Sequence, residues 1–164
     1  MRIKIKRNIK EGPKELTPFK LSNTQDKIAT QIEEFYAKKK RYSGIEEIGE
    51  WKGYELRKIV GKFDKTHRWF LYDDGEPKLF VQFSDYGDPQ GLQINNIRKT
   101  EGGFNASDFY KFLMDQQDIN PNGILYSDSQ QTPGGKSIWS QLDADPDIEV
   151  EDLGKVLRAK FKVE

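Results

Sequence analysis

The alternation of hydrophobic and polar residues predicts strands through the middle of the chain. The candidate strands span residues 54–60, 67–72, 78–83 and 91–97. The sequence Asp-Asp-Gly-Glu-Pro at residues 73–77 is a strong hairpin signal between two of them. Because tight turns join antiparallel strands, this pattern predicts an antiparallel meander across residues 54–97.

Two elements are predicted before the meander. Residues 1–9 alternate between apolar and basic side chains, which is typical of an edge strand with lysines facing outward. Ser22 and Gln25 resemble a capping box that opens a helix. The basic run 38–41 suits the C-terminal end of that helix, and it is also the first candidate contact for an acidic partner. The apolar stripe of this helix consists of Ile28, Ile32, Phe35 and Tyr36.

After the meander, the pattern changes to helices that alternate with strands. Asn105 or Ser107 can cap a helix with apolar residues at helical spacing. Residues 123–126 form a short apolar strand, and Thr132–Pro133 is a good start for another helix. An acidic turn at residues 143–147 leads into two terminal strands. Since a helix between two strands gives a parallel pair, the strand 123–126 is expected to run parallel to its neighbour.

The element order β-α-β-β-β-β-α-β-α-β-β predicts an α/β fold with a mixed sheet. With 164 residues, the chain is long enough to bury a sizeable core. We therefore expect a single domain that spans residues 1–164.

The composition excludes several classes of function. The formal net charge is zero, from 27 basic and 27 acidic residues, which argues against general nucleic-acid binding. There is no cysteine, and the single histidine, His67, cannot form a multi-histidine metal site. No apolar run approaches the roughly 18 residues of a membrane span, and the N-terminus lacks the apolar core of a signal peptide. We expect a cytoplasmic protein with no membrane partner.

Charge is unevenly distributed along the chain. Residues 1–41 carry 12 Lys and Arg against 5 Asp and Glu, a net charge of +7, and residues 101–164 carry 6 against 12, a net charge of −6. Such polarity can mark a surface for a charged partner, or the two ends can neutralise each other in the fold. Sequence alone leaves both interpretations open.

The order of elements resembles the GNAT-type N-acetyltransferase fold over nearly the whole chain. In that family a meander of three or four strands leads through a phosphate-binding loop into a central helix. A parallel strand, another helix and two terminal strands follow. The segment 127–142, SDSQQTPGGKSIWSQL, is also similar to a pattern in small GNAT-like proteins of bacteriophages. The resemblance implies a GNAT-like mixed sheet with an antiparallel meander, a central helix and a parallel β-α unit, in a protein of the host cytoplasm.

The resemblance also implies a site for acetyl-CoA. GNAT enzymes hold the pyrophosphate with backbone N–H groups at the N-terminus of the central helix. The equivalent stretch is 98–106, RKTEGGFNA, in which Glu101 adds a negative charge and the two glycines are adjacent rather than spaced. The cofactor-binding residues implied by the resemblance are Arg98, Gly102, Gly103, Asn105 and Ala106.

Acyl transfer in this family requires a base for the acceptor amine and often a tyrosine acid for the leaving thiolate. Asp128 and Glu101 are the candidate bases, with His67 as a further one, and Tyr126 is the candidate acid. Each has a structural alternative, and Tyr126 on its apolar strand suits a core position.

Two functions follow. The first is a phage-type accessory protein on a GNAT-like scaffold, which binds a protein partner without acetyl transfer. The uneven charge, the incomplete cofactor loop and the many aromatic residues favour it. The alternative is an active acetyl-CoA-dependent N-acyltransferase that modifies a protein or a small amine. Nucleic-acid binding through the basic N-terminal third is a weaker third hypothesis.

Overall fold

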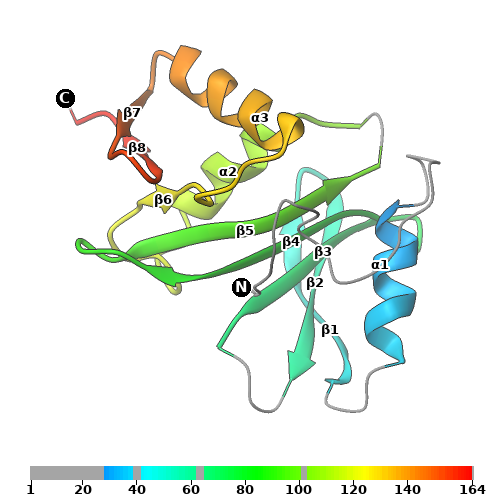
Figure 1. The fold of residues 1–164 in the computed structure, drawn as a ribbon. Coiled ribbons are helices and arrows are strands. Elements are labelled where there is room, and N and C mark those ends of the chain that lie inside the picture. Colours follow the sequence, from blue (N-terminus) through cyan, green and yellow to red (C-terminus); the bar gives the residue numbers. More distant parts are fainter. Residues whose placement is uncertain (1–27, 39–41, 62–64, 101–102, 164) are drawn as a thin grey trace. The chain divides into compact units, whose positions relative to one another are not determined.

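The computed structural model describes residues 28–38, 42–61, 65–100 and 103–163 (Figure 1). The described elements are α1 (Ile28–Ala37), β1 (Tyr42–Trp51), β2 (Tyr54–Gly61), β3 (His67–Asp73), β4 (Glu76–Tyr86), β5 (Gly91–Lys99), α2 (Ala106–Met114), β6 (Leu125–Tyr126), α3 (Pro133–Ala144), β7 (Ile148–Asp152) and β8 (Leu157–Phe161).

The strands follow the order β1-β2-β3-β4-β5-β6-β8-β7. The pairs β1–β2, β2–β3 and β3–β4 are antiparallel, as are β6–β8 and β7–β8. Strands β5 and β6 are parallel, and α2 lies between them in the chain. The predicted α/β class, the mixed sheet and the parallel strand after the helix are therefore confirmed.

The chain divides into two compact units. The first consists of Met1–Phe83 and Asn96–Gly102, and the second of Ser84–Asn95 and Gly103–Glu164. Strands β4 and β5 contribute residues to both units. Each unit has its own buried side chains and is described by itself.

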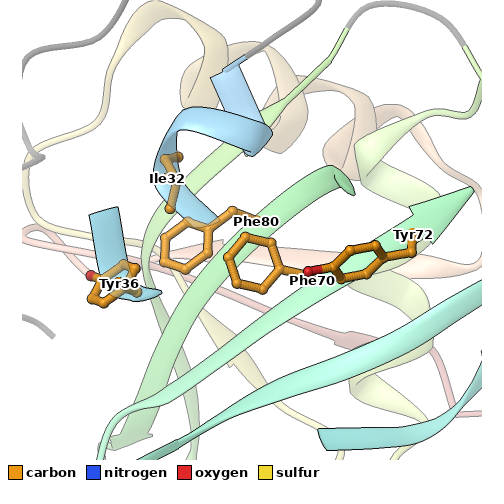
Figure 2. Packing of buried hydrophobic residues seen from close by; sticks show 5 residues of the cluster. All are labelled: Ile32, Tyr36, Phe70, Tyr72 and Phe80. Atoms are coloured by element: carbon orange, nitrogen blue, oxygen red, sulfur yellow. The ribbon is translucent and has the colours of Figure 1, made fainter. Parts of the chain in front are cut away.

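The core of the first unit lies where α1 covers strands β3 and β4. Ile32 and Tyr36 of α1 pack with Phe70, Tyr72 and Phe80 of the two strands (Figure 2). The Tyr36 and Phe80 rings are stacked, with centroids 5.7 Å apart. The helical spacing of the apolar residues in α1 therefore marks the buried face, as the sequence predicts.

Strand β1 is the element that the hydrophobic pattern does not predict. It contains Gly44 and Gly49 as well as three glutamates, so it lacks the period-two alternation of a half-buried strand. It pairs with β2 through a two-residue turn at Lys52 and Gly53, whose φ angles are 51° and 84°. Positive φ at both positions is the geometry of a tight hairpin. The turn residues, rather than the strand residues, therefore indicate this hairpin.

The core of the second unit combines α2 and α3 with buried residues of its strands, including Leu125 and Ala159. Phe109, Tyr110 and Leu113 of α2 are buried, as are Trp139 and Leu142 of α3. The Tyr110 and Trp139 rings meet edge to face at 6.1 Å. The helical spacing of Ile138, Trp139 and Leu142 predicts that Trp139 anchors α3, and its burial confirms this.

Helix α3 begins as predicted. The Thr132 side chain accepts a hydrogen bond from the Gly135 N–H at 3.1 Å, and Pro133 occupies the first turn, where its missing N–H leaves no partner unsatisfied.

Three details differ from the predictions. Strand β6 is limited to Leu125 and Tyr126, although the Ile124 carbonyl accepts a hydrogen bond from Leu92 N–H at 3.0 Å. The apolar spacing predicts that Phe109, Phe112 and Leu113 form the buried face of α2, whereas Phe112 is half-buried and the flanking Tyr110 is buried. The alternation at residues 157–163 predicts Val163 in the last strand, but β8 ends at Phe161 and Val163 is 89% exposed.

Several predicted features lie outside the described residues. They are the strand 1–9, the capping box at Ser22 and Gln25, residues 39–41 of the basic run, Glu101 and Gly102. None of the helices in the described ranges is long and apolar enough to cross a membrane.

Replacing Trp139 by alanine should destabilise the fold by about 3–5 kcal/mol, because it leaves a cavity between α3 and α2. Urea unfolding followed by circular dichroism measures the loss. Ser140→Ala, at the exposed neighbouring position, is the matched control and should change stability little. Equal midpoints for Trp139→Ala and the parent would contradict the packing role.

Candidate functional site

The candidate site lies where β5 and β6 part. The two strands pair only at Leu92 with Leu125 and at Gln93 with Tyr126. The next residue, Ser127, bonds to β8: its N–H donates to the Leu157 carbonyl at 2.9 Å, and its hydroxyl accepts from the Leu157 N–H at 2.8 Å. The chain therefore leaves β5 directly after β6.

A row of polar side chains extends from β4 to this point. The Ser84 hydroxyl donates to Asn95 Oδ1 at 3.2 Å, and Asn95 Nδ2 donates to Gln93 Oε1 at 3.4 Å. Gln93 Nε2 in turn donates to the Ser127 carbonyl at 3.1 Å. The Gln93 side-chain amide thus bonds to the carbonyl of Ser127, the residue after the last β5–β6 pair. This hydrogen bond lies at the place where the two strands separate.

Asp128 follows two residues after β6. Its Oδ1 accepts a hydrogen bond from the Gln130 N–H at 3.4 Å. Burial raises the pKa of this carboxyl group from 3.8 to about 6, although hydrogen bonds from Gln130 and Ser129 act in the opposite direction. A carboxylate with a pKa near 6 can accept a proton at neutral pH, so Asp128 has the properties of a general base.

Two tyrosines lie near this strand end. Tyr110 is buried on α2, and desolvation, followed by the negative charge of Asp128, raises its pKa. Tyr126 is also buried, and its hydroxyl donates to the Pro89 carbonyl at 2.5 Å. Its ring meets Tyr86 edge to face at 5.0 Å. The hydroxyl of Tyr126, the candidate acid, therefore already has a structural partner.

The N-terminus of α2 is the second part of the site. Asn105 is the N-cap residue, and its side chain makes no capping hydrogen bond. The Asn105 carbonyl accepts from Asp108 N–H at 3.1 Å, and Gly103 has a φ of 87°. The Asn105 side chain therefore does not cap the helix, and a helix N-terminus favours an anion through its N–H groups and its dipole. Ala106 is the first residue of the helix.

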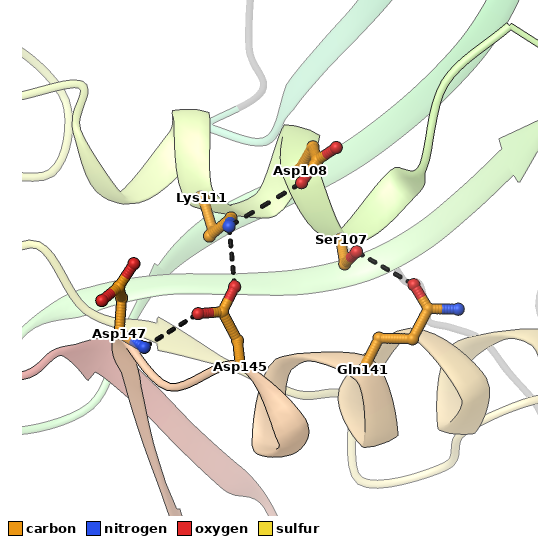
Figure 3. Close-up of polar contacts among 6 residues, drawn as sticks. All are labelled: Ser107, Asp108, Lys111, Gln141, Asp145 and Asp147. Carbon is orange, nitrogen blue, oxygen red and sulfur yellow. Dashed lines mark hydrogen bonds and ion pairs between the residues drawn. The ribbon is translucent and has the colours of Figure 1, made fainter.

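Polar contacts hold α2 against α3 (Figure 3). Lys111 Nζ lies 2.7 Å from Asp145 Oδ2 and 3.8 Å from Asp108 Oδ1. The Ser107 hydroxyl donates to Gln141 Oε1 at 2.9 Å. The hydrogen bond to Asp145 raises the pKa of Lys111 and lowers that of Asp145, so both groups remain charged at neutral pH. These contacts fix the direction in which the start of α2 points.

The structure places five of the sequence-predicted site residues in the second unit: Gly103, Asn105, Ala106, Tyr126 and Asp128. Arg98 belongs to the first unit, where its guanidinium donates to the Ile97 carbonyl at 2.8 Å. His67 is also in the first unit and stacks on Phe83 at 4.9 Å.

Ser84, Gln93 and Asn95 are not predicted as site residues from the sequence. Their signal was a set of amide and hydroxyl residues at alternate positions of strands that are otherwise apolar.

No three His, Cys, Asp or Glu side chains group as metal ligands in the described ranges. No family model, curated protein or solved structure matches this chain.

Replacing Asp128 by asparagine should stabilise the protein at neutral pH. Because the folded-state pKa of about 6 exceeds the ordinary value of 3.8, the free energy of unfolding falls as pH rises between these values. At pH values above the folded-state pKa of about 6, the buried charge of Asp128 should lower the free energy of unfolding by about 3 kcal/mol. Thermal unfolding across the acid range measures the effect.

In Asp128→Asn, that fall in stability should be absent. Asp118→Asn, an exposed change in the same unit, should keep the pH profile of the parent. A parent profile that rises through this pH range would contradict the assignment.

Proposed function

We propose that this chain is a small GNAT-like protein of the bacteriophage type and that it catalyses acetyl-CoA-dependent N-acyl transfer. The strand order supports the GNAT-like scaffold. A meander is followed by β5, α2 and a parallel β6, and then by α3 and two terminal strands, with β8 between β6 and β7. This is the sequence of elements that the GNAT resemblance implies.

The residues at the start of α2 fit an anionic diphosphate. Their N–H groups have no side-chain cap, and the positive end of the helix dipole lies at the same place. Gly103, Asn105 and Ala106 would hold the diphosphate of acetyl-CoA, which supplies the acyl thioester when bound. Asp108 in the first turn opposes an anion, but its charge is partly offset by Lys111.

The observation that carries the proposal is the position of Asp128 at the end of β6, beside the point where β5 and β6 part. Desolvation gives this carboxylate a pKa of about 6. Such a group can take the proton of an acceptor amine at neutral pH and release it again after transfer. Gln93 holds the adjacent Ser127 carbonyl and so positions the loop that carries Asp128.

Protein binding without catalysis is the second candidate function. Strand β1 forms one of the two edges of the sheet within the described residues, and its Ile45 and Ile48 are 37% and 38% exposed. An edge strand with exposed apolar side chains is a common surface for a protein partner. This role needs no acetyl-CoA, so cofactor binding separates the two candidates.

Acetyl-CoA should stabilise the protein by about 2.7 kcal/mol at a concentration about 100 times its Kd. Ala106→Glu should weaken binding at least about tenfold, because it places a negative charge beside the diphosphate. The same charge favours the helix dipole, so the variant should still fold. Isothermal titration calorimetry measures the affinity, and Ala106→Gln is the neutral control of the same size.

If acetyl-CoA binds the parent, Asp128→Asn should abolish acyl transfer to an amine while leaving cofactor affinity unchanged. Absence of any binding at millimolar acetyl-CoA would reject the enzymatic proposal and favour the role in protein binding.

A further inference from the structure

The outer edge of β1 carries no strand partner within the described residues. Strand β1 pairs with β2 on one side and ends the sheet on the other. Every residue from Gly44 to Glu50 is exposed. The backbone N–H and C=O groups along such an edge are a template for one more strand, and natural proteins usually cover or protect them. The edge is therefore a surface that an extended segment can occupy.

One face of this edge has a surplus of negative charge. Glu47 lies opposite Arg57 in the β1–β2 register, and Glu50 lies opposite Glu55. Because residues 55 and 57 share a face of β2, Glu47 and Glu50 lie on that face as well. The face thus combines three carboxylates with the Arg57 guanidinium, which lies 2.6 Å from Glu55. A hydrogen bond shared with Glu55 and the charge of Glu55 raise the pKa of Glu47. Additional cations at this face would stabilise the edge.

The chain contains a segment with the complementary pattern. Residues 1–9 alternate between apolar and basic side chains and include no acidic residue. In a strand this alternation places Lys4 and Lys6 on one face and Ile3 and Ile5 on the other. Strand β1 has ten residues, so the two lengths match. The segment therefore suits an acidic edge both in its charge and in its period.

The connection to the described fold is long enough for this pairing. Residues 10–27 lie between the segment and α1 and can span about 60 Å when extended. Helix α1 begins at Ile28 and contacts β1, so the connection starts close to the edge in question. Because the segment is covalently attached, its pairing is intramolecular and avoids the loss of translational freedom that a separate partner pays.

We propose that residues 1–9 pair with the open edge of β1 as an additional strand of the first unit. Lys4 and Lys6 would lie beside Glu47 and Glu50, and the backbone of the segment would bond to the outward N–H and C=O groups of β1. Pairing of β1 with a second copy of itself is disfavoured, because it would bring like charges together. A protein partner that uses this edge would first have to displace the segment. The pairing does not depend on acyl transfer.

Nuclear magnetic resonance of the full chain tests the pairing. Cross-strand NOEs should join residues 1–9 to residues 44–50, and the outward amides of β1 should be protected from hydrogen exchange. The charge-reversal variant Lys4→Glu/Lys6→Glu should reduce this protection at least about tenfold, because it places like charges beside each other. The loss of protection should be smaller at high salt.

Lys10→Glu/Lys14→Glu is the matched control, since it makes the same change of charge outside the segment. It should keep the protection of the parent. Absence of cross-strand NOEs in the parent, or unchanged protection of β1 after the charge reversal within residues 1–9, would overturn the proposal. NOEs found only between differently labelled copies would also overturn it, because the occupant would then be a second chain.

A charge swap tests the specificity of the contact. Glu47→Lys/Glu50→Lys alone should lose the protection, and its combination with Lys4→Glu/Lys6→Glu should restore it. Failure of the combined variant to regain protection would contradict the proposed contact between these side chains. The amides of β3, a buried strand, report on global unfolding and should exchange at the parent rate in every variant.

Discussion

The two-residue pairing of β5 and β6 is the constraint on which the second unit depends. Ser127 ends this pairing because its N–H donates to the Leu157 carbonyl of β8 and its hydroxyl accepts from the Leu157 N–H. The close approach of the backbones before this point requires Gly91, since a Cβ there would collide with the Ile124 carbonyl. Strand β6 is therefore held between β5 and β8 by two residue pairs on each side. The loop that carries Asp128 begins where the pairing of β6 with β5 ends.

The two helices of the second unit, one on each side of β6 in the sequence, support this arrangement. Helix α2 connects the parallel strands, and α3 follows the loop that contains Asp128. The Tyr110–Trp139 contact joins the two helices through their buried faces, and the Lys111–Asp145 and Ser107–Gln141 contacts join them at the surface. Because burial contributes far more than a partly exposed ion pair, the aromatic contact should dominate the energy and the polar contacts the orientation.

The sequence predicted the elements that local chemistry determines strongly. The Asp74–Gly75 turn, the Thr132 cap and the apolar stripe of α1 are each specified by neighbouring residues. Strand β1 was missed because its glycines and glutamates give no alternation, and its pairing depends on β2. Tertiary context often overrides strand propensity in this way.

The candidate site could be predicted only in part. Asp128, Asn105 and Ala106 were expected as site residues through the resemblance to GNAT enzymes, and local capping chemistry indicated the helix start near Asn105. The polar row of Ser84, Asn95 and Gln93 could not be predicted. It depends on the register between neighbouring strands, which the residue pattern of a single strand does not reveal. The sequence also favoured protein binding over acyl transfer. The proposal of acyl transfer takes account of the raised pKa of Asp128, which arises from burial that no local pattern reveals.

The burial of Asp128 is itself an argument for a function at this position. Hydrogen bonds from Ser129 and Gln130 offset only part of the desolvation, so the charged form destabilises the folded protein at neutral pH. An asparagine could accept the same turn hydrogen bonds without this cost. A structural role alone would thus be served better by the uncharged residue. A carboxylate in a position where its charge destabilises the fold is expected to serve in proton transfer or cation binding. Such costly groups concentrate at functional sites.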